Sequence, residues 1–184
     1  MKAVIFDTET TGLIKNRMVS LDKLPEIIEF YACLIDFDDP ETILDEIDFL
    51  IKPSLMTELP PIIEKVTGLN YDKDLKDKKT FRSFAKSIKS FLQDADFVIA
   101  HNFAFDRDMV EIEMERLNMK MEWPTPICTV EQTRHIKGFN LNLGKLYELL
   151  FDEKMKSAHR AKVDVQNLVK VCKRLSQDGL LPVN

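Results

Sequence analysis

The sequence predicts a mixed α/β fold, in which helices flank a central sheet that contains an antiparallel meander. Two observations predict it. Short apolar runs bounded by turn residues occupy the first third of the chain, and apolar residues at helical spacing are common in the rest. The chain has 184 residues, 45% of them hydrophobic, which is enough to bury a core without disulfides or metals. We therefore expect one domain over residues 1–184.

Four apolar runs are expected to form strands. They cover residues 3–6, 27–35, 43–51 and 97–100. The first three follow one another through loops, which favours an antiparallel meander. The connection over residues 13–25 is long for a hairpin loop and indicates a mobile flap.

Five segments carry apolar residues at the spacing of a helix. They cover residues 60–66, 81–93, 103–117, 143–150 and 160–175. Gly68 is expected to close the first, because glycine adopts the left-handed conformation that ends many helices. Thr80 and Asn142 are expected to cap the N-termini of the second and the fourth.

Charge and composition exclude several classes of protein. The net charge of −5 and the pI of about 5.3 argue against a broad basic surface for duplex nucleic acid. One basic cluster beside His159 is still a candidate for phosphate contact; it consists of Lys154, Lys156, Arg160 and Lys162. No glycine-rich phosphate loop and no GxSxG nucleophile elbow occurs.

Cysteine use and hydropathy favour a cytoplasmic location. Cys33, Cys128 and Cys172 are scattered and odd in number, as expected for reduced thiols in a core. The chain has no signal peptide and no run of about 20 apolar residues, so we expect no membrane contact. It ends soon after the last predicted helix, without a tail that would tether it to a polymerase.

Four carboxylates and one imidazole stand where predicted elements begin or end. Asp7 and Glu9 directly follow the first strand, where buried acids are costly unless something such as a metal ion pairs with them. Asp106 lies on the first turn of the helix after the fourth strand. Asp164 lies in the first turns of the last helix, with His159 just before it. Strand ends and the helices leaving them commonly line a cleft, so these five side chains are expected to converge.

This set suits metal-assisted hydrolysis of a phosphodiester. Mg²⁺ and Mn²⁺ prefer oxygen ligands and need few carboxylates each, so four carboxylates suffice for two ions. Two ions about 3.5–4 Å apart can clamp an in-line phosphoryl displacement. His159 titrates near neutral pH and is a candidate general base. A zinc site is disfavoured because His101, His135 and His159 are far apart and lack cysteine partners at ligand spacing.

Three motifs resemble those of the DEDDh class of 3′–5′ exonucleases, typified by the proofreading epsilon subunit of bacterial DNA polymerase III. Phe-Asp-Thr-Glu-Thr-Thr-Gly-Leu at 6–13 is similar to the first motif, His-Asn-x-x-Phe-Asp at 101–106 to the second, and His-x-Ala-x-x-Asp at 159–164 to the third. They stand in the family's order. A sister class has tyrosine four residues before the last aspartate; here that residue is Arg160, so the histidine class fits.

The resemblance implies a ribonuclease H-like fold, with parallel strands added to the meander, as a single exonuclease domain. It implies that two Mg²⁺ or Mn²⁺ ions are held by Asp7, Glu9, Asp106 and Asp164, with His159 as general base. It also implies release of nucleoside 5′-monophosphates from the 3′ end of a single strand. The residues implied to contact that strand are Thr10, Gly12, Leu13, His101, Asn102 and Phe105. By residue type alone, Leu13 and Phe105 would instead belong to the core.

Three functions stay open at this point. The preferred one is a 3′–5′ exonuclease on single-stranded or frayed DNA, in proofreading or end processing, with a DNA polymerase as a candidate partner. The nearest alternative is the same two-metal chemistry on RNA, because the motifs serve both substrates. A non-catalytic nucleic-acid-binding or polymerase-accessory module is disfavoured, because all four carboxylates and the histidine are present.

Overall fold

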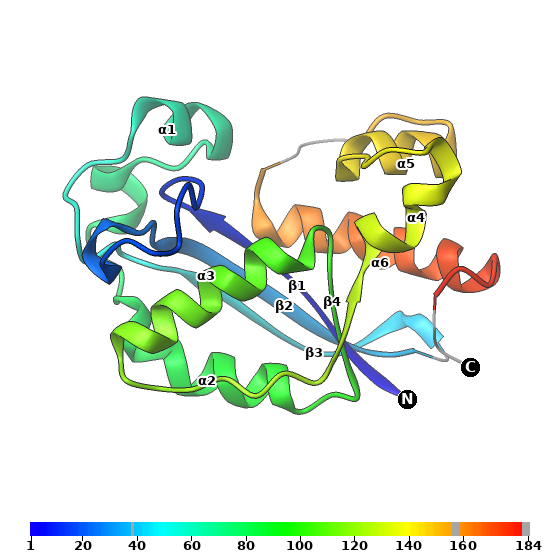
Figure 1. Ribbon diagram of the computed structural model, residues 1–184, viewed down its shortest axis with the longest axis horizontal. Coiled ribbons are helices and arrows are strands. Elements are labelled where there is room, and N and C mark those ends of the chain that lie inside the picture. The colour runs from blue at the N-terminus through cyan, green and yellow to red at the C-terminus, as the bar shows by residue number, and fades with distance from the viewer. Residues whose placement is uncertain (38, 156–158, 182–184) are drawn as a thin grey trace.

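The computed structural model describes residues 1–37, 39–155 and 159–181 and is built on one five-stranded sheet (Figure 1). The strands lie in the order β3-β2-β1-β4-β5. Their bounds are Lys2–Thr10 for β1, Ile27–Asp36 for β2, Asp39–Leu50 for β3, Phe97–Ala100 for β4 and Thr125–Cys128 for β5.

The sheet is mixed, as the sequence predicted. β1 pairs antiparallel with β2, and β2 with β3, which confirms the meander. β1 pairs parallel with β4, and β4 with β5. β1 is longer than predicted, because its pairing with β2 continues beyond Phe6 as far as Thr10. Asp7 and Glu9 therefore lie inside the strand near its end, and not in the turn after it.

The predicted helices are confirmed to within two residues at each end. The helices are Pro61–Thr67 (α1), Phe81–Gln93 (α2), Phe103–Arg116 (α3), Thr129–Lys137 (α4), Leu143–Phe151 (α5) and Ala161–Gln177 (α6). Gly68 ends α1 with φ of +71°, and the Asn142 side chain accepts a hydrogen bond from the Lys145 N–H. Thr80 stands at the N-cap of α2 but makes no capping hydrogen bond with its side chain. α4 and β5 were not predicted, because α4 is mostly polar and β5 is four residues long and contains a proline.

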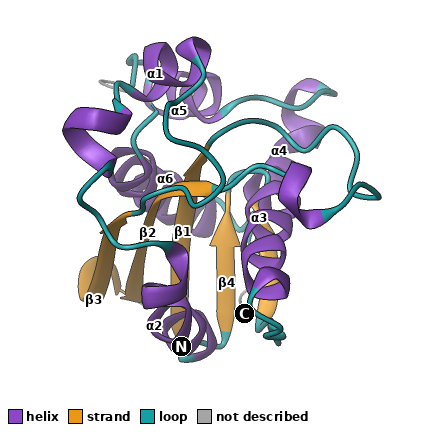
Figure 2. Ribbon diagram, turned by 90° about the vertical axis from the view of Figure 1, so that its left-hand side faces the viewer, coloured by secondary structure: helices purple, strands orange, loops and turns teal. Residues whose placement is uncertain are grey.

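Alternate residues of β1 face two separate cores, so the sheet lies between layers of helices (Figure 2). Val4 and Phe6 belong to the core formed with α2 and α3. Ala3 and Ile5 belong to the core formed with α5 and α6. Because side chains alternate along a strand, Asp7 and Glu9 continue the α6 side. The residues at the end of β1 therefore point alternately toward α6 on one face of the sheet and toward α3 on the other.

Residues 13–25, predicted to be a mobile flap, are fastened to α3. Arg116 donates hydrogen bonds of 2.8–3.3 Å to backbone carbonyls in this segment. The acceptors are Leu21, Leu24 and Pro25. Arg17 adds an ion pair of 2.6 Å with Glu115. The segment therefore forms a rim held by α3, and its contacts do not favour a freely moving flap.

Three smaller predictions can be compared with the structure. All three cysteines are free, with Cys33 and Cys172 buried and Cys128 half-buried, so two of the three lie fully in the core as expected, and their reduced state stays a prediction. No helix in the described part of the chain is long and apolar enough to cross a membrane. In the basic cluster, Lys156 lies outside the described residues, and Lys162 is already paired with acidic side chains of β3.

Candidate active site

The end of β1 presents acidic side chains to one face of the sheet and a threonine to the other. Asp7 and Glu9 are half-buried and lie on the α6 side. The register of β1 against β2 shifts between Glu9 and Thr10. Such irregularities bend a strand and change the direction of its side chains, and they are common beside active sites.

Asp106 reaches the same strand end from α3. One of its carboxylate oxygens, Oδ1, accepts hydrogen bonds from the Thr8 backbone N–H at 3.0 Å and from the Thr8 hydroxyl at 2.7 Å. The side chain is only 3% exposed. Hydrogen bonds to an ionised carboxylate are among the stronger ones in proteins, so β1 and α3 hold Asp106 in one position.

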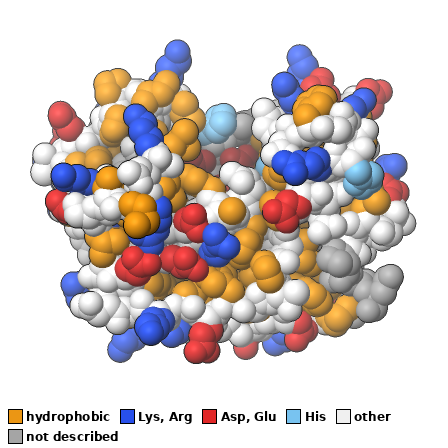
Figure 3. Space-filling view, in the orientation of Figure 1, with side chains coloured by type: hydrophobic (Ala, Val, Ile, Leu, Met, Phe, Trp, Pro, Cys, Tyr) orange, Lys and Arg blue, Asp and Glu red, His pale blue; other side chains and the backbone are white. Residues whose placement is uncertain are grey.

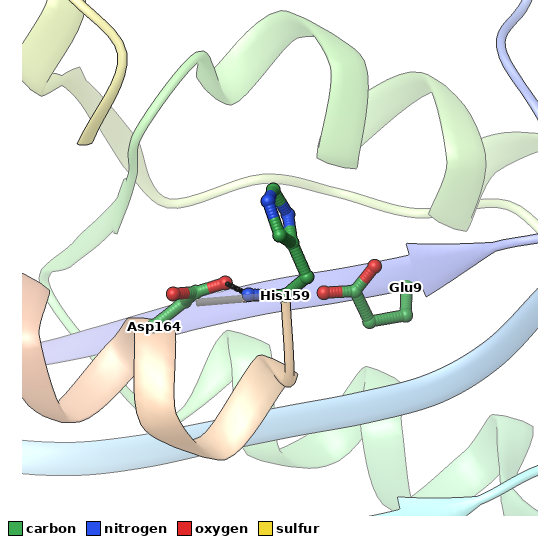
Figure 4. A group of neighbouring side chains, drawn as sticks. All are labelled: Glu9, His159 and Asp164. Carbon is green, nitrogen blue, oxygen red and sulfur yellow. Dashed lines mark hydrogen bonds between the residues drawn. The ribbon is translucent and has the colours of Figure 1, made fainter. Parts of the chain in front are cut away.

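Asp164 and His159 reach the site from the N-terminus of α6. The His159 backbone N–H donates to Asp164 Oδ2 at 2.9 Å. Figure 4 shows Glu9 and Asp164 on either side of His159. Each of these three residues offers one possible ligand atom, and the three atoms lie within 4.8 Å of one another. The structure thus brings residues 9, 159 and 164 together, as the sequence predicted.

Burial raises the pKa of the carboxylates at this site, and repulsion between them raises the pKa of Asp7 and of Glu9 further. Burial raises the pKa of Asp7 well above its usual value, and repulsion from Asp106, Glu9 and Asp164 raises it further. Burial, followed by repulsion from Asp164, raises the pKa of Glu9 to about 8. Burial also raises the pKa of Asp106, although the hydrogen bonds from Thr8 act in the opposite direction. Like charges held this close favour their charged forms only when a cation neutralises them.

Two observations show that these residues fit a divalent cation. Asp164 Oδ1 is buried and has no hydrogen-bond partner among the described residues. An acceptor buried without a partner is costly, and a metal ion would satisfy it. The mutual repulsion of the carboxylates would also be relieved by positive charge. Oxygen donors of this kind suit Mg²⁺ or Mn²⁺.

His101 lies at the end of β4 and lines the same pocket, but both of its ring nitrogens are engaged inside the protein. Nδ1 lies 2.9 Å from Thr129 Oγ1, and Nε2 donates to the Leu141 carbonyl at 3.0 Å. Burial lowers the pKa of the ring and favours its neutral form. Asn102 is exposed beside it at the N-cap of α3, with φ of +73°. These contacts favour a structural role for His101. Asn102 is more exposed and is therefore more available to a ligand.

The other predicted substrate residues differ in exposure. Leu13 is 76% exposed, so the interpretation of Leu13 as a core residue is wrong. Phe105 is half-buried and packs against the α2–α3 core, which agrees with its residue type. Thr10 is buried, and its hydroxyl donates to the Gly12 carbonyl at 2.8 Å, which shapes the turn after β1.

A pocket of about 280 Å³ lies beside Asp7, His159 and Asp164. It is lined by Asp7, His101, Asn142, Leu143, Gly144, Met155, His159 and Asp164. Figure 3 shows an indentation at the upper part of this face, with acidic side chains and a histidine at its base. The site is therefore open to a ligand from solvent.

Sequence reasoning did not single out Glu29, and it used Arg160 to tell two classes apart and as a candidate phosphate contact, without predicting that the two residues pair. Glu29 lies opposite Glu9 in the sheet register and is 1% exposed. Arg160 forms an ion pair with it at 2.7 Å. The one available signal was an acid inside the apolar run Ile27–Ile35, since a charge in a buried strand needs a partner.

Known proteins with similar sequences are exonucleases and DNA polymerase subunits. The RNase_T exonuclease family model matches residues 4–172. DNA polymerase III subunit epsilon of Buchnera aphidicola subsp. Schizaphis graminum is 27% identical over 161 residues, covering 86% of this chain and 66% of that protein. The same subunit from subsp. Acyrthosiphon pisum is 30% identical over 135 residues, covering 73% and 53%. The 3′-5′ exonuclease DinG of Bacillus subtilis is 28% identical over 168 residues, covering 89% and 16%. The chain thus spans about two thirds or less of each relative.

Solved structures share the fold. The nuclease domain of 3′hExo, a DEDDh family member bound to rAMP, superposes with a TM-score of 0.78 at 18% identity, covering all of this chain and 96% of that one. A 3′-exonuclease studied for 3′-end recognition of a histone mRNA stem-loop gives 0.77 at 18% identity, covering 97% and 64%. These matches confirm the ribonuclease H-like fold. Since the family model spans most of the sequence, the chain belongs to the RNase_T exonuclease family, as a DnaQ-like member of its DEDDh class.

Proposed function

We propose that the chain is a metal-dependent 3′–5′ exonuclease that acts on single-stranded or frayed DNA ends and releases nucleoside 5′-monophosphates. The observation that supports it most is the convergence of Glu9, His159 and Asp164, drawn from two distant parts of the sequence, within 4.8 Å. Asp7 lines the same pocket, and Asp106 raises the pKa of Asp7 by repulsion. Family membership gives the class of reaction.

The proposed roles of these side chains are those that the DEDDh resemblance implies, and their positions are compatible with them. Asp7, Glu9, Asp106 and Asp164 would hold two divalent ions, either Mg²⁺ or Mn²⁺. Bound there, the ions would neutralise charge on the phosphoryl oxygens and lower the pKa of a bound water. The His159 ring accepts the proton of the attacking water. The water oxygen forms its bond to phosphorus as the bond to the 3′ oxygen breaks, and the leaving 3′ hydroxyl takes a proton from solvent.

The terminal nucleotide is proposed to lie over the turn that follows β1. Leu13 offers an exposed apolar surface that would wedge against the terminal base. Thr10, Gly12, His101, Asn102 and Phe105 are proposed to shape the rest of its binding site. Unpaired bases are required at this position, which is consistent with a single-stranded or frayed 3′ end.

DNA is preferred as substrate because two of the curated relatives are epsilon subunits of DNA polymerase III. A DNA polymerase is accordingly the proposed partner. RNA is the second candidate, because one structural neighbour is bound to rAMP and another is described with a histone mRNA stem-loop. A single exonuclease domain over residues 1–184 stays a prediction.

One assay tests the activity and separates the two substrates. The protein is incubated with Mg²⁺ or Mn²⁺ and a 5′-labelled single-stranded DNA, beside RNA of the same sequence, with and without a chelator. We expect a metal-dependent ladder that shortens from the 3′ end, faster on DNA. A faster reaction on RNA would select the exoribonuclease, and cleavage of neither by folded, metal-loaded protein would contradict the proposal.

A further inference from the structure

One buried carboxylate on β2 fixes the N-terminus of α6. Glu29 Oε1 accepts hydrogen bonds from Arg160 Nη2 at 2.7 Å and from Nε at 3.1 Å. Glu29 Oε2 accepts from Arg160 Nε at 3.0 Å and from the Ala161 backbone N–H at 3.0 Å. A single side chain therefore holds both the side chain of Arg160 and the first backbone N–H of the helix, across more than 130 positions of sequence.

The backbone held in this way is the one that carries the proposed chemistry. His159 directly precedes Arg160, and the Asp164 N–H donates to the Arg160 carbonyl at 2.9 Å. His159 has φ of +69°, a backbone conformation that residues other than glycine rarely adopt. Such a conformation persists only where the surrounding contacts impose it. The contacts of Glu29 with the next two residues, together with the hydrogen bond from the His159 N–H to Asp164, are placed to impose it.

Glu29 also lies beside the part of the site that β1 contributes. Its partner in the β1–β2 register is Glu9, so both side chains project from the same face of the sheet. Arg160 binds Glu29, and its positive charge lowers the pKa of Glu9, which opposes the repulsion that acts on Glu9. The Glu29–Arg160 ion pair links the α6 end of the site to the β1 end.

We propose that Glu29 and Arg160 are positioning residues, which hold His159 and Asp164 against Glu9 at the separation that divalent ions require. Neither residue acts on the reacting atoms. The inference rests on the proposed function, because it assigns these residues to the metal site. Removing one partner of a fully buried ion pair destabilises a fold strongly, but the Arg160 side chain is 43% exposed and water can solvate it, so the effect is expected on the site more than on the fold. Partners behind metal ligands typically change metal affinity or activity about 10- to 100-fold.

The test uses Glu29→Gln and Arg160→Lys, with Mn²⁺ binding by calorimetry, turnover of a single-stranded oligonucleotide and thermal melting measured on each. Glu29→Gln keeps an oxygen for the Ala161 N–H but removes the ion pair. Arg160→Lys keeps the charge but loses the two-pronged geometry. We expect Glu29→Gln to weaken Mn²⁺ binding and to lower kcat about 10- to 100-fold with KM and melting temperature nearly unchanged, and Arg160→Lys to lose less. Arg174→Gln, which breaks an ion pair at the far end of α6, is the matched control.

Three results would overturn the inference. If Glu29→Gln keeps the Mn²⁺ affinity and kcat of the wild type, the ion pair does not position the metal site. A rise in KM alone would make Arg160 a substrate contact. Losses that follow the melting temperature would make the pair a folding element. The Mn²⁺ titration needs no substrate, so it still decides the matter if the wild-type protein cleaves neither DNA nor RNA and the proposed function fails.

Discussion

Asp106 and Asp164 bring the same chemical group to the same end of β1, but the fold holds them differently. Asp106 is almost fully buried, and two donors from Thr8 satisfy one of its oxygens. Asp164 is half-buried; one oxygen accepts the His159 N–H, and the other is buried with no hydrogen-bond partner among the residues that the structure describes. The carboxylate that α3 contributes is therefore held in place once the chain folds. The α6 half keeps a ligand position that only a cation or another donor would satisfy.

Asp7 lines the pocket between these halves, so its removal is expected to have the largest effect. Asp7→Ala should lose high-affinity metal binding and at least about 10⁴-fold in kcat, measured by calorimetry and oligonucleotide cleavage. Asp108→Asn is the control, since Asp108 lies two residues from Asp106 but pairs with Arg107. Full activity in Asp7→Ala would mean that the site assignment is wrong.

His159 tests what the α6 half contributes beyond metal ligands. His159→Ala should lower kcat about 10²–10⁴-fold, because the attacking water loses its base, while Mn²⁺ affinity stays close to wild type. A large loss of Mn²⁺ affinity would instead make the imidazole a ligand, which its place beside Glu9 and Asp164 allows. Unchanged turnover would remove the histidine from the mechanism.

Thr8 tests the α3 half. Thr8→Val keeps the shape of the side chain and the backbone N–H but removes the hydroxyl that donates to Asp106 at 2.7 Å. We expect about a 10-fold loss of kcat and a stability loss of about 1 kcal/mol. Thr133→Val, which removes another buried hydroxyl bond, should cost similar stability with normal kcat. Equal activity in the two variants would show that the Thr8 hydroxyl does not position Asp106.

The last expected effect is on stability as a function of pH and not on turnover. The pKa of Glu9 rises from 4.5 in the unfolded chain to about 8 in the folded one. An acid with a raised folded pKa stabilises the protein fully below its unfolded pKa, and this contribution is lost as pH rises toward the folded pKa. Without metal, the melting temperature of wild type should therefore fall relative to Glu9→Gln between about pH 4.5 and 8. Added Mg²⁺ should raise it more at pH 8 than at pH 6. A parallel pH dependence in both proteins would contradict the shift.

The fold was largely predictable because its signals are local. The apolar runs of β1 and β2, helical spacing in α2, α3 and α6, and the cap at Asn142 all depend on neighbours a few residues apart. β5 and α4 were missed because neither carries such a signal. The rim over residues 13–25 was predicted to be mobile because its fastening by Arg116 depends on a helix about 90 positions away.

The sequence by itself indicated five candidate residues for the chemistry and the order in which they occur, and it implied that Asp7 and Glu9 share one face of β1. These follow from residue type and from the two-residue period of a strand. Only the tertiary structure decided that Thr8 holds Asp106, that Glu29 holds Arg160, and that one oxygen of Asp164 lacks a donor. Those contacts join residues 98 and 131 positions apart. Register and helix packing bring such residues together, and no local pattern in the chain encodes the pairing.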